Sequence, residues 1–149
     1  MRVVLHRVKQ ASVRVDGAIV AEIAQGALLL AGITPADGEA QVDWMAKKIA
    51  TLRIFPATDG PSGFDRSLID IAGSALVVSQ FTLYGEARKG RRPDFVRAAQ
   101  PEHAAPLIER FAARLRAEGV PRVEQGVFGA EMQVALINDG PATFILEMD

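Results

Sequence analysis

The chain consists of short apolar runs separated by polar turn residues, and this spacing predicts more strands than helices. Residues 2–8 and 11–15 are rich in valine and typical of strands, and Asp16-Gly17 is a hairpin turn that would return residues 18–23 antiparallel. The unbroken apolar run from Ala27 to Ile33 predicts a strand that is buried on both faces. Further strands are expected over residues 53–56, 75–81, 120–128, 131–137 and 143–148, with a loop over residues 57–66.

Two segments show the apolar spacing of helices. The first is predicted over residues 39–53, with Asp37 as a candidate cap. Its apolar face carries Val42, Met45, Ala46, Ile49 and Leu52. The second starts at Pro101 or, because of Pro106, a few residues later, and Gly119 stops it. These elements predict an α+β fold, in which a strongly curved, mostly antiparallel sheet or open β-barrel packs against two helices.

Length and composition narrow the class of protein. The chain has 149 residues, 49% of them apolar, so we expect a single domain over residues 1–149 with its own core. It contains no cysteine, which excludes disulfides and thiolate chemistry and favours a cytoplasmic protein. No apolar run approaches the ~18 residues of a membrane span, so no membrane association is expected. Because the net charge is -1, any nucleic-acid contact must come from a local basic patch.

The side chains that usually carry catalysis are scarce. His6 lies in a predicted strand, where we expect a half-buried structural role, and His103 lies near a helix start, where we expect solvent exposure. The sequence has none of the usual motifs for metal ions, nucleotide phosphates or serine hydrolases, so no metal or other cofactor is expected. An enzyme with this inventory must rely on positioning and on backbone donors at a developing oxyanion, acting on an activated ester.

Three polar segments remain as candidate sites. Ser79-Gln80-Phe81-Thr82-Leu83 follows the apolar run 75–78, and Asn138-Asp139-Gly140-Pro141-Ala142-Thr143 interrupts the apolar runs 134–137 and 144–146. Polar groups at strand ends face outward from a rigid scaffold, where sites are often built. The third segment, Arg88-Lys89-Gly90-Arg91-Arg92, is suited to phosphate contacts, and a solvated loop is the alternative for a basic cluster of this length.

With their spacers, these segments give the chain a resemblance to the D-aminoacyl-tRNA deacylase family over essentially all 149 residues. The resemblance is carried by Arg7-Val8, Ala11-Ser12-Val13, Lys48, Leu52-Arg53-Ile54-Phe55, Val77-Val78-Ser79-Gln80-Phe81-Thr82-Leu83-Tyr84, Lys89-Gly90-Arg91-Arg92-Pro93, Phe128-Gly129-Ala130 with Met132, and Asn138-Asp139-Gly140-Pro141 with Thr143. It implies a homodimer that hydrolyses the ester between a D-amino acid, or glycine, and the 3′ end of tRNA. This reaction recycles tRNA and proofreads chirality in translation.

The resemblance also implies a chirality filter and a tRNA contact. Gly140 and Pro141, joined by a cis bond in the family, would reach from one protomer into the pocket of the other. Their backbone carbonyls would meet the substrate and reject an L side chain, which is specificity by exclusion. The implied tRNA contacts are made by Arg88, Lys89, Arg91 and Arg92.

The floor of the implied pocket comes from Ser79, Gln80, Phe81 and Thr82. The backbone N–H groups of Phe81 and Thr82 are candidates for stabilising the oxyanion, and the Phe81 ring would lie near the terminal adenine. Two sources of catalysis stay open: Thr82 as nucleophile, or assistance from the 2′-hydroxyl of the terminal ribose. We favour the second because the sequence offers no base beside Thr82.

The chain departs from the family pattern at three places. His6 stands where glutamine is usual, Ala142 replaces a valine, and residues 64–67 replace a loop of the Met-Asn-Leu-Ser type. Two other functions remain open, namely a non-catalytic tRNA-binding dimer and the sister deacylase that acts on L-alanyl-tRNA. Phe81 disfavours the sister deacylase, because that group has alanine at this position.

Overall fold

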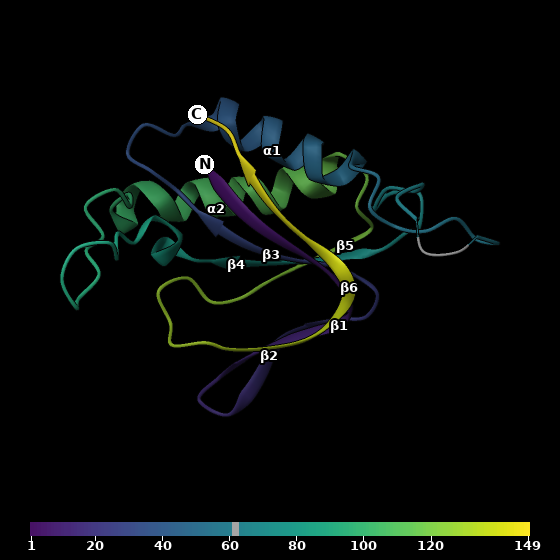
Figure 1. The fold of residues 1–149 in the computed structure, drawn as a ribbon, viewed down its shortest axis with the longest axis horizontal. Helices are drawn as coiled ribbons and strands as arrows, with labels where there is room; N and C mark the ends of the chain where they lie inside the picture. Colours follow the sequence, from purple (N-terminus) through teal and green to yellow (C-terminus); the bar gives the residue numbers. More distant parts are fainter. Residues whose placement is uncertain (61–62) are drawn as a thin grey trace.

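The structure, a computed structural model, describes residues 1–60 and 63–149. Figure 1 shows the elements in chain order. They are β1 (Arg2–Val15), β2 (Ala18–Ile23), β3 (Gly26–Gly32), α1 (Glu39–Thr51), β4 (Ser74–Ser79), the 3₁₀ helix η1 (Phe81–Tyr84), α2 (Pro101–Ala117), β5 (Arg122–Gln125) and β6 (Gln133–Glu147). Within the described residues, neither α1 nor α2 is long and apolar enough to cross a membrane.

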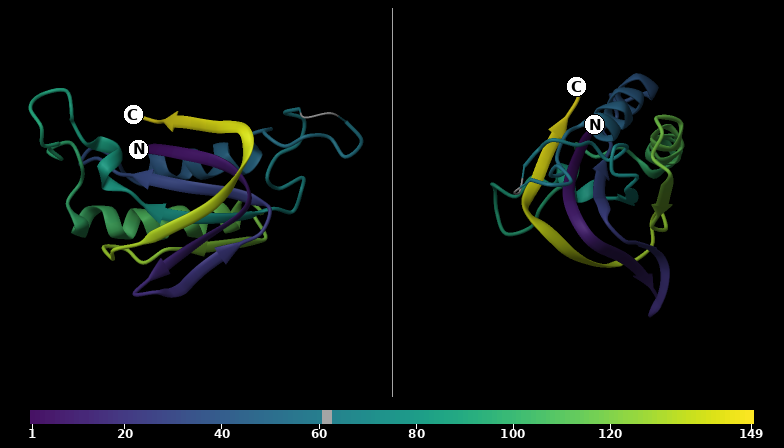
Figure 2. Two further views of the ribbon diagram at one scale, coloured as in Figure 1. Left: turned by 60° about the horizontal axis from the view of Figure 1, so that its bottom comes forward. Right: turned by 90° about the vertical axis from the view of Figure 1, so that its right-hand side faces the viewer.

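The six strands form one strongly curved sheet, which approaches a closed barrel (Figure 2). β1 is antiparallel to β2, β3 and β6, whereas the pairs β3–β4 and β4–β5 are parallel. β1 has three partners because it is long. Along one edge of β1, residues 2–8 pair with β3 and residues 11–15 pair with β2, and along its other edge β1 pairs with β6. The α+β class, the curved sheet and the two helices are confirmed, with a larger parallel share than the hairpin signals indicated.

The core has two layers because side chains alternate along the central strands. In β4, Ala75 and Val77 pack in the cluster that contains α1 and α2, whereas Leu76 and Val78 pack in a second cluster on the opposite face. Both clusters are buried, which explains why the apolar runs of β3 and β4 are unbroken.

The two helices lie side by side on one face of the sheet (Figures 1 and 2). Arg110 of α2 donates to both carboxylate oxygens of Asp43 in α1, at 2.9 and 2.8 Å, and this pairing lowers the pKa of Asp43. α2 begins at Pro101 and continues through Pro106 without a break, so the earlier of the two predicted starts is correct. Gly119, with φ +104°, follows the helix end as predicted.

The prediction that Asp37 caps α1 is wrong. The helix begins after Gly38, and its first turn is closed by the Gln41 side chain, which accepts from the Gly38 N–H at 3.0 Å. Asp37 is buried instead, where its carboxylate accepts from the Thr34 N–H at 2.7 Å and pairs with the amino group of Met1.

Several predicted strand limits also change. Residues 2–8 and 11–15 form one strand with pairing irregularities between them, and the strand expected over residues 53–56 is reduced to an isolated bridge between Phe55 and Arg66. Of the strand expected over residues 120–128, only residues 122–125 form a strand, β5. The segment 138–143 does not interrupt two strands but lies inside β6, because β1 pairs with β6 on both sides of it. The predicted loop 57–66 includes residues 61–62, which lie outside the described residues.

Candidate active site

The first polar motif lies where the central strand β4 leaves the core. Residues 75–78 are buried, Ser79 and Gln80 are half-buried, and Phe81 and Thr82 are exposed at the start of η1. The Gln80 N–H donates to the Ala31 carbonyl of β3 at 2.8 Å, which fixes the motif to the neighbouring strand. The end of β4 and the 3₁₀ helix η1 together present Ser79, Gln80 and Phe81 on a rigid base, as the sequence indicated.

Tyr84 anchors the other end of η1. Its ring is buried, and the guanidinium groups of Arg2 and Arg97 lie 4.9 and 5.8 Å from the ring centroid. Burial raises the pKa of the Tyr84 hydroxyl to about 12. A Cβ atom at Gly32 would come within 3.2 Å of this ring and within 3.1 Å of the Gln80 carbonyl, so β3 ends in a residue that allows the close approach.

Beside the motif is a cavity of about 480 Å³, a size suited to a small ligand. It is bounded by the ends of β3 and β4, by the start of α2 and by the segment before β6. Its lining includes Ser79, Gln80 and Phe81 together with Ile33, Phe95, Ala104, Ile108, Phe128, Gly129, Ala130 and Met132. Thr82, Gly140 and Pro141 are not in this lining. The structure therefore brings three of the four predicted floor residues together and leaves Thr82 at the edge.

The Thr82 hydroxyl has a hydrogen-bond partner but no base. The side-chain amide of Gln80 donates to Thr82 Oγ1. Within the described residues, no histidine or carboxylate makes a hydrogen bond to this hydroxyl. His6 is half-buried and lies 3.0 Å from Thr143 Oγ1, and the exposed His103 lies 2.8 Å from the Asp37 carbonyl. The expected placement of both histidines is confirmed, and neither serves Ser79 or Thr82.

The N–H groups of Phe81 and Thr82 stand at the start of η1. Within the described residues no backbone acceptor is recorded for either of them, whereas the next N–H, that of Leu83, bonds to the Gln80 carbonyl at 3.2 Å. The first donors of a helix are regularly without an internal partner and point along its axis. Two adjacent donors of this kind can stabilise a negatively charged oxygen.

The second polar motif lies on β6 and is held by Arg7. Gly140 and Pro141 are exposed, and the peptide bond between them is cis. Arg7, a residue only 4% exposed, donates from Nε to the Asp139 carbonyl at 2.9 Å. From the other side, the Asn138 amide donates to the Arg7 carbonyl at 3.0 Å and to the Ala142 carbonyl at 3.4 Å. Asn138 and Asp139 thus fix the near end of the Gly140–Pro141 segment to β1, and the pairing of Thr143 with His6 fixes the far end.

The two motifs lie at opposite ends of the sheet within one chain. The pairing register places Asn138 opposite Val8, Val8 opposite Gly26, and Gly26 opposite Ser74 at the beginning of β4. On that strand the cavity lining begins at Val78, four residues further along. Four strand residues correspond to about 13 Å. The Gly140–Pro141 segment therefore does not border the cavity of its own chain.

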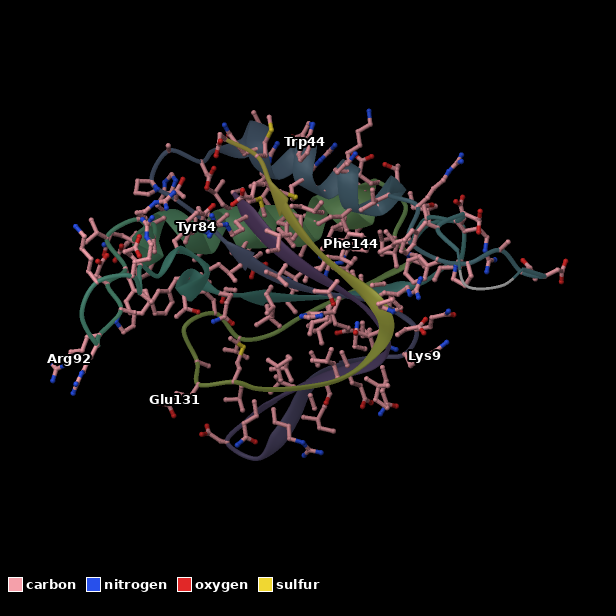
Figure 3. All side chains as sticks on the ribbon, viewed as in Figure 1. Lys9, Trp44, Tyr84, Arg92, Glu131 and Phe144 are labelled. Atoms are coloured by element: carbon pink, nitrogen blue, oxygen red, sulfur yellow. The ribbon has the colours of Figure 1, made fainter. Side chains whose placement is uncertain are left out.

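The basic residues 88–92 occupy a projecting loop. Its base is closed by paired hydrogen bonds between the backbones of Glu86 and Asp94, at 2.9 and 3.1 Å. Arg88 is engaged by the Glu86 carboxylate, and this pairing lowers the pKa of Glu86 to about 2. Lys89, Arg91 and Arg92 are exposed, and Figure 3 shows Arg92 extending away from the body of the molecule.

Sequence reasoning gave no role to several residues of these sites. Phe128, Gly129 and Met132 line the cavity, and Arg7 holds the second motif. All four lie in segments that carry the family resemblance. The sequence therefore marked these positions but did not indicate what each residue does. Within the described residues, no group of three or more His, Asp or Glu side chains is arranged to hold a metal ion.

Comparisons with known proteins identify the family of this chain. The family model described as D-Tyr-tRNA(Tyr) deacylase matches residues 4–147. The D-aminoacyl-tRNA deacylase of Thermomicrobium roseum is 58% identical over 99% of this chain and 94% of its own length, and that of Exiguobacterium sibiricum is 56% identical over 99% of both. The solved structure of a c-Myc DNA unwinding element binding protein superposes with a TM-score of 0.93 at 37% identity and covers 100% of this chain and 99% of its own. The chain belongs to the D-Tyr-tRNA(Tyr) deacylase family.

Proposed function

We propose that this protein hydrolyses the ester that joins a D-amino acid, or glycine, to the 3′ end of tRNA. The observation that carries the proposal is the match of residues 4–147 to the deacylase family, with relatives of that name above 50% identity. Water adds to the ester carbonyl, the bond to the ribose oxygen breaks, and the products are a D-amino acid and tRNA with a free hydroxyl. This substrate places the reaction in the cytoplasm.

The cavity beside Ser79, Gln80 and Phe81 receives the terminal nucleotide with its aminoacyl group. The exposed Phe81 ring, in edge contact with Phe95 at a centroid distance of 5.0 Å, offers a surface against which the adenine stacks. The N–H groups of Phe81 and Thr82 stabilise the oxyanion of the tetrahedral intermediate. The terminal 2′-hydroxyl assists the reaction, since no histidine or carboxylate of the described residues bonds to the Thr82 hydroxyl.

Chirality is read by the Gly140–Pro141 segment of a second copy of the chain. The segment is exposed and lies far from the cavity of its own chain. β6 pairs only with β1 among the described strands, and it carries exposed apolar side chains, including Ile137 at 52% and Ile145 at 68% exposure. An exposed apolar strand edge is a surface for pairing with another copy. In the dimer, the two backbone carbonyls exclude an L side chain.

The projecting loop supplies the contact to the tRNA backbone through Lys89, Arg91 and Arg92, with Arg88 beside them. This basic loop also favours the second candidate, a dimer that binds tRNA without turnover. A third candidate, a deacylase for L-alanyl-tRNA, is disfavoured by the aromatic ring at Phe81.

The test is hydrolysis of matched D-tyrosyl-tRNA and L-tyrosyl-tRNA by the purified protein. Loss of the D ester with the L ester intact is the expected result. Loss of both esters would overturn the filter. Binding of tRNA with no hydrolysis would replace the proposal by the binding function, and hydrolysis of L-alanyl-tRNA alone would replace it by the sister activity.

A further inference from the structure

Phe64 lies over the arginine that holds the Gly140–Pro141 segment. The centroid of its ring is 5.9 Å from Arg7 Cζ, and the same ring meets Phe144 of β6 edge-on at a centroid distance of 5.8 Å and an interplanar angle of 72°. Phe64 is 55% exposed, whereas Arg7 is 4% exposed. One face of the partly exposed Phe64 ring therefore contacts the buried guanidinium of Arg7.

The backbone that follows the ring is paired with residues 55–56. The backbones of Phe55 and Arg66 pair through hydrogen bonds of 2.9 Å in both directions, and Arg66 Nε donates to the Pro56 carbonyl at 2.8 Å. Ile54, at the base of this pairing, accepts a hydrogen bond of 2.6 Å from Arg7 Nη1. The guanidinium of Arg7 thus meets this segment twice, at the Ile54 carbonyl and at the Phe64 ring.

The Arg7 guanidinium has little freedom once these contacts are made. Nη1 is fixed by Ile54 and Nε by the Asp139 carbonyl, while the Phe64 ring covers a face. A long cationic side chain otherwise has many rotamers, and an aromatic face restricts them while keeping water from its hydrogen bonds. Phe64 therefore acts on the peptide that precedes Gly140 through a side chain that touches both.

We propose that Phe64 is a positioning residue for the chirality filter, acting through Arg7. The inference rests on the proposed function, because it assigns Phe64 to the discrimination between D and L esters. It assigns a role to one of the places where this chain departs from the family pattern. Phe64 touches neither substrate nor reacting atoms in this account.

Two variants test the role, Phe64→Leu and Phe64→Tyr. Leucine keeps apolar volume but has no ring, whereas tyrosine restores the ring face. Each is assayed for the ratio of D-tyrosyl-tRNA to L-tyrosyl-tRNA hydrolysis rates. In parallel, the Arg7 Nε–H resonance is recorded by NMR in ¹⁵N-arginine-labelled protein, since a ring over the guanidinium shifts that proton. Trp44→Leu is the matched control, because Trp44 is also a partly exposed aromatic residue, at 41%, but lies on α1.

Phe64→Leu should lower the D/L ratio by about two- to fivefold, the range of a weak cation–π contact, and shift the Arg7 resonance. Phe64→Tyr should keep the D/L ratio and the Arg7 resonance of the unaltered protein. Trp44→Leu should change neither quantity. An unchanged D/L ratio in Phe64→Leu would overturn the inference while the deacylase assignment stands. An equal loss in Phe64→Tyr, which keeps the ring, would do the same. A change in oligomeric state as the cause of the loss, checked by light scattering, would also overturn it. Absence of D-ester hydrolysis by the unaltered protein would overturn both.

Discussion

The Nε atom of Arg7 donates a hydrogen bond of 2.9 Å to the backbone carbonyl of Asp139, the residue before Gly140-Pro141. The two residues are 132 positions apart in sequence, and β1 and β6 bring them together. The Asp139 carboxylate lies 3.3 Å from the same nitrogen and 3.4 Å from Lys9 Nζ. One buried and one exposed cation therefore share the end of the Gly140–Pro141 segment.

This difference in burial predicts different outcomes for the two cations. Arg7→Lys keeps the charge but cannot reach both the Asp139 and Ile54 carbonyls, so we expect a loss of about 1–3 kcal/mol in unfolding free energy and a lower D/L ratio. Lys9 is 59% exposed, so Lys9→Gln should cost less than about 1 kcal/mol and leave the ratio unchanged. Urea denaturation and paired deacylation assays measure both effects. Equal effects of the two substitutions would contradict the assignment.

The pattern of apolar residues was sufficient for the fold class and for the position of the polar segment at the end of β4. Alternation and unbroken runs reveal which strands are buried, and a polar segment directly after Val78 can only lie at the edge of the core. The continuity of β6 through residues 138–143 was not predictable in this way, because it depends on pairing with β1 rather than on local composition. The role of Arg7 was hidden for the same reason, since its partners come from distant segments.

Thr82 should be dispensable for the chemical step. Its hydroxyl accepts from the Gln80 amide and has no base within the described residues, so Thr82→Ala is expected to reduce kcat by no more than about tenfold. Removal of a true nucleophile costs several orders of magnitude. Single-turnover hydrolysis of D-tyrosyl-tRNA, with Thr82→Ser as the matched control, distinguishes the two. A collapse of the rate in Thr82→Ala with serine retaining activity would identify Thr82 as the nucleophile.

The projecting loop should govern the salt dependence of tRNA binding. Replacing Lys89, Arg91 and Arg92 together by alanine is expected to reduce the slope of log K against log salt by about 2 to 3. Arg88 is engaged by Glu86, so Arg88→Ala should change the slope by less than any one of the three exposed cations. Filter-binding titrations across a range of salt concentrations measure the slopes. A slope that the triple variant leaves unchanged would remove the loop from the tRNA interface.

Tyr84 offers a direct optical test of the packing below η1. It is the single tyrosine of the chain, and its pKa is raised to about 12 because the ring is buried. The neutral form is thus favoured in the folded protein, so this group stabilises the fold fully below pH ~10, and its contribution is lost between pH ~10 and the folded pKa. The ultraviolet absorbance of the tyrosinate should appear about two pH units higher in native protein than in denaturant. A native titration near pH ~10 would mean that the ring is accessible to solvent.

If the proposed function is correct, one active site needs two chains, a cavity from one and the Gly140–Pro141 segment from the other. Ala104→Phe fills the cavity, and Gly140→Val obstructs the segment, where an added Cβ meets only the Asn138 side chain within its own chain. Each variant alone should lose most D-tyrosyl-tRNA hydrolysis while remaining folded and dimeric. The decisive measurement is the activity of the two variants after they are unfolded and refolded together. We expect recovery of about a quarter of the unaltered activity, because half of the random dimers carry one intact site. A mixture that stays inactive, although mass spectrometry detects mixed dimers, would contradict it.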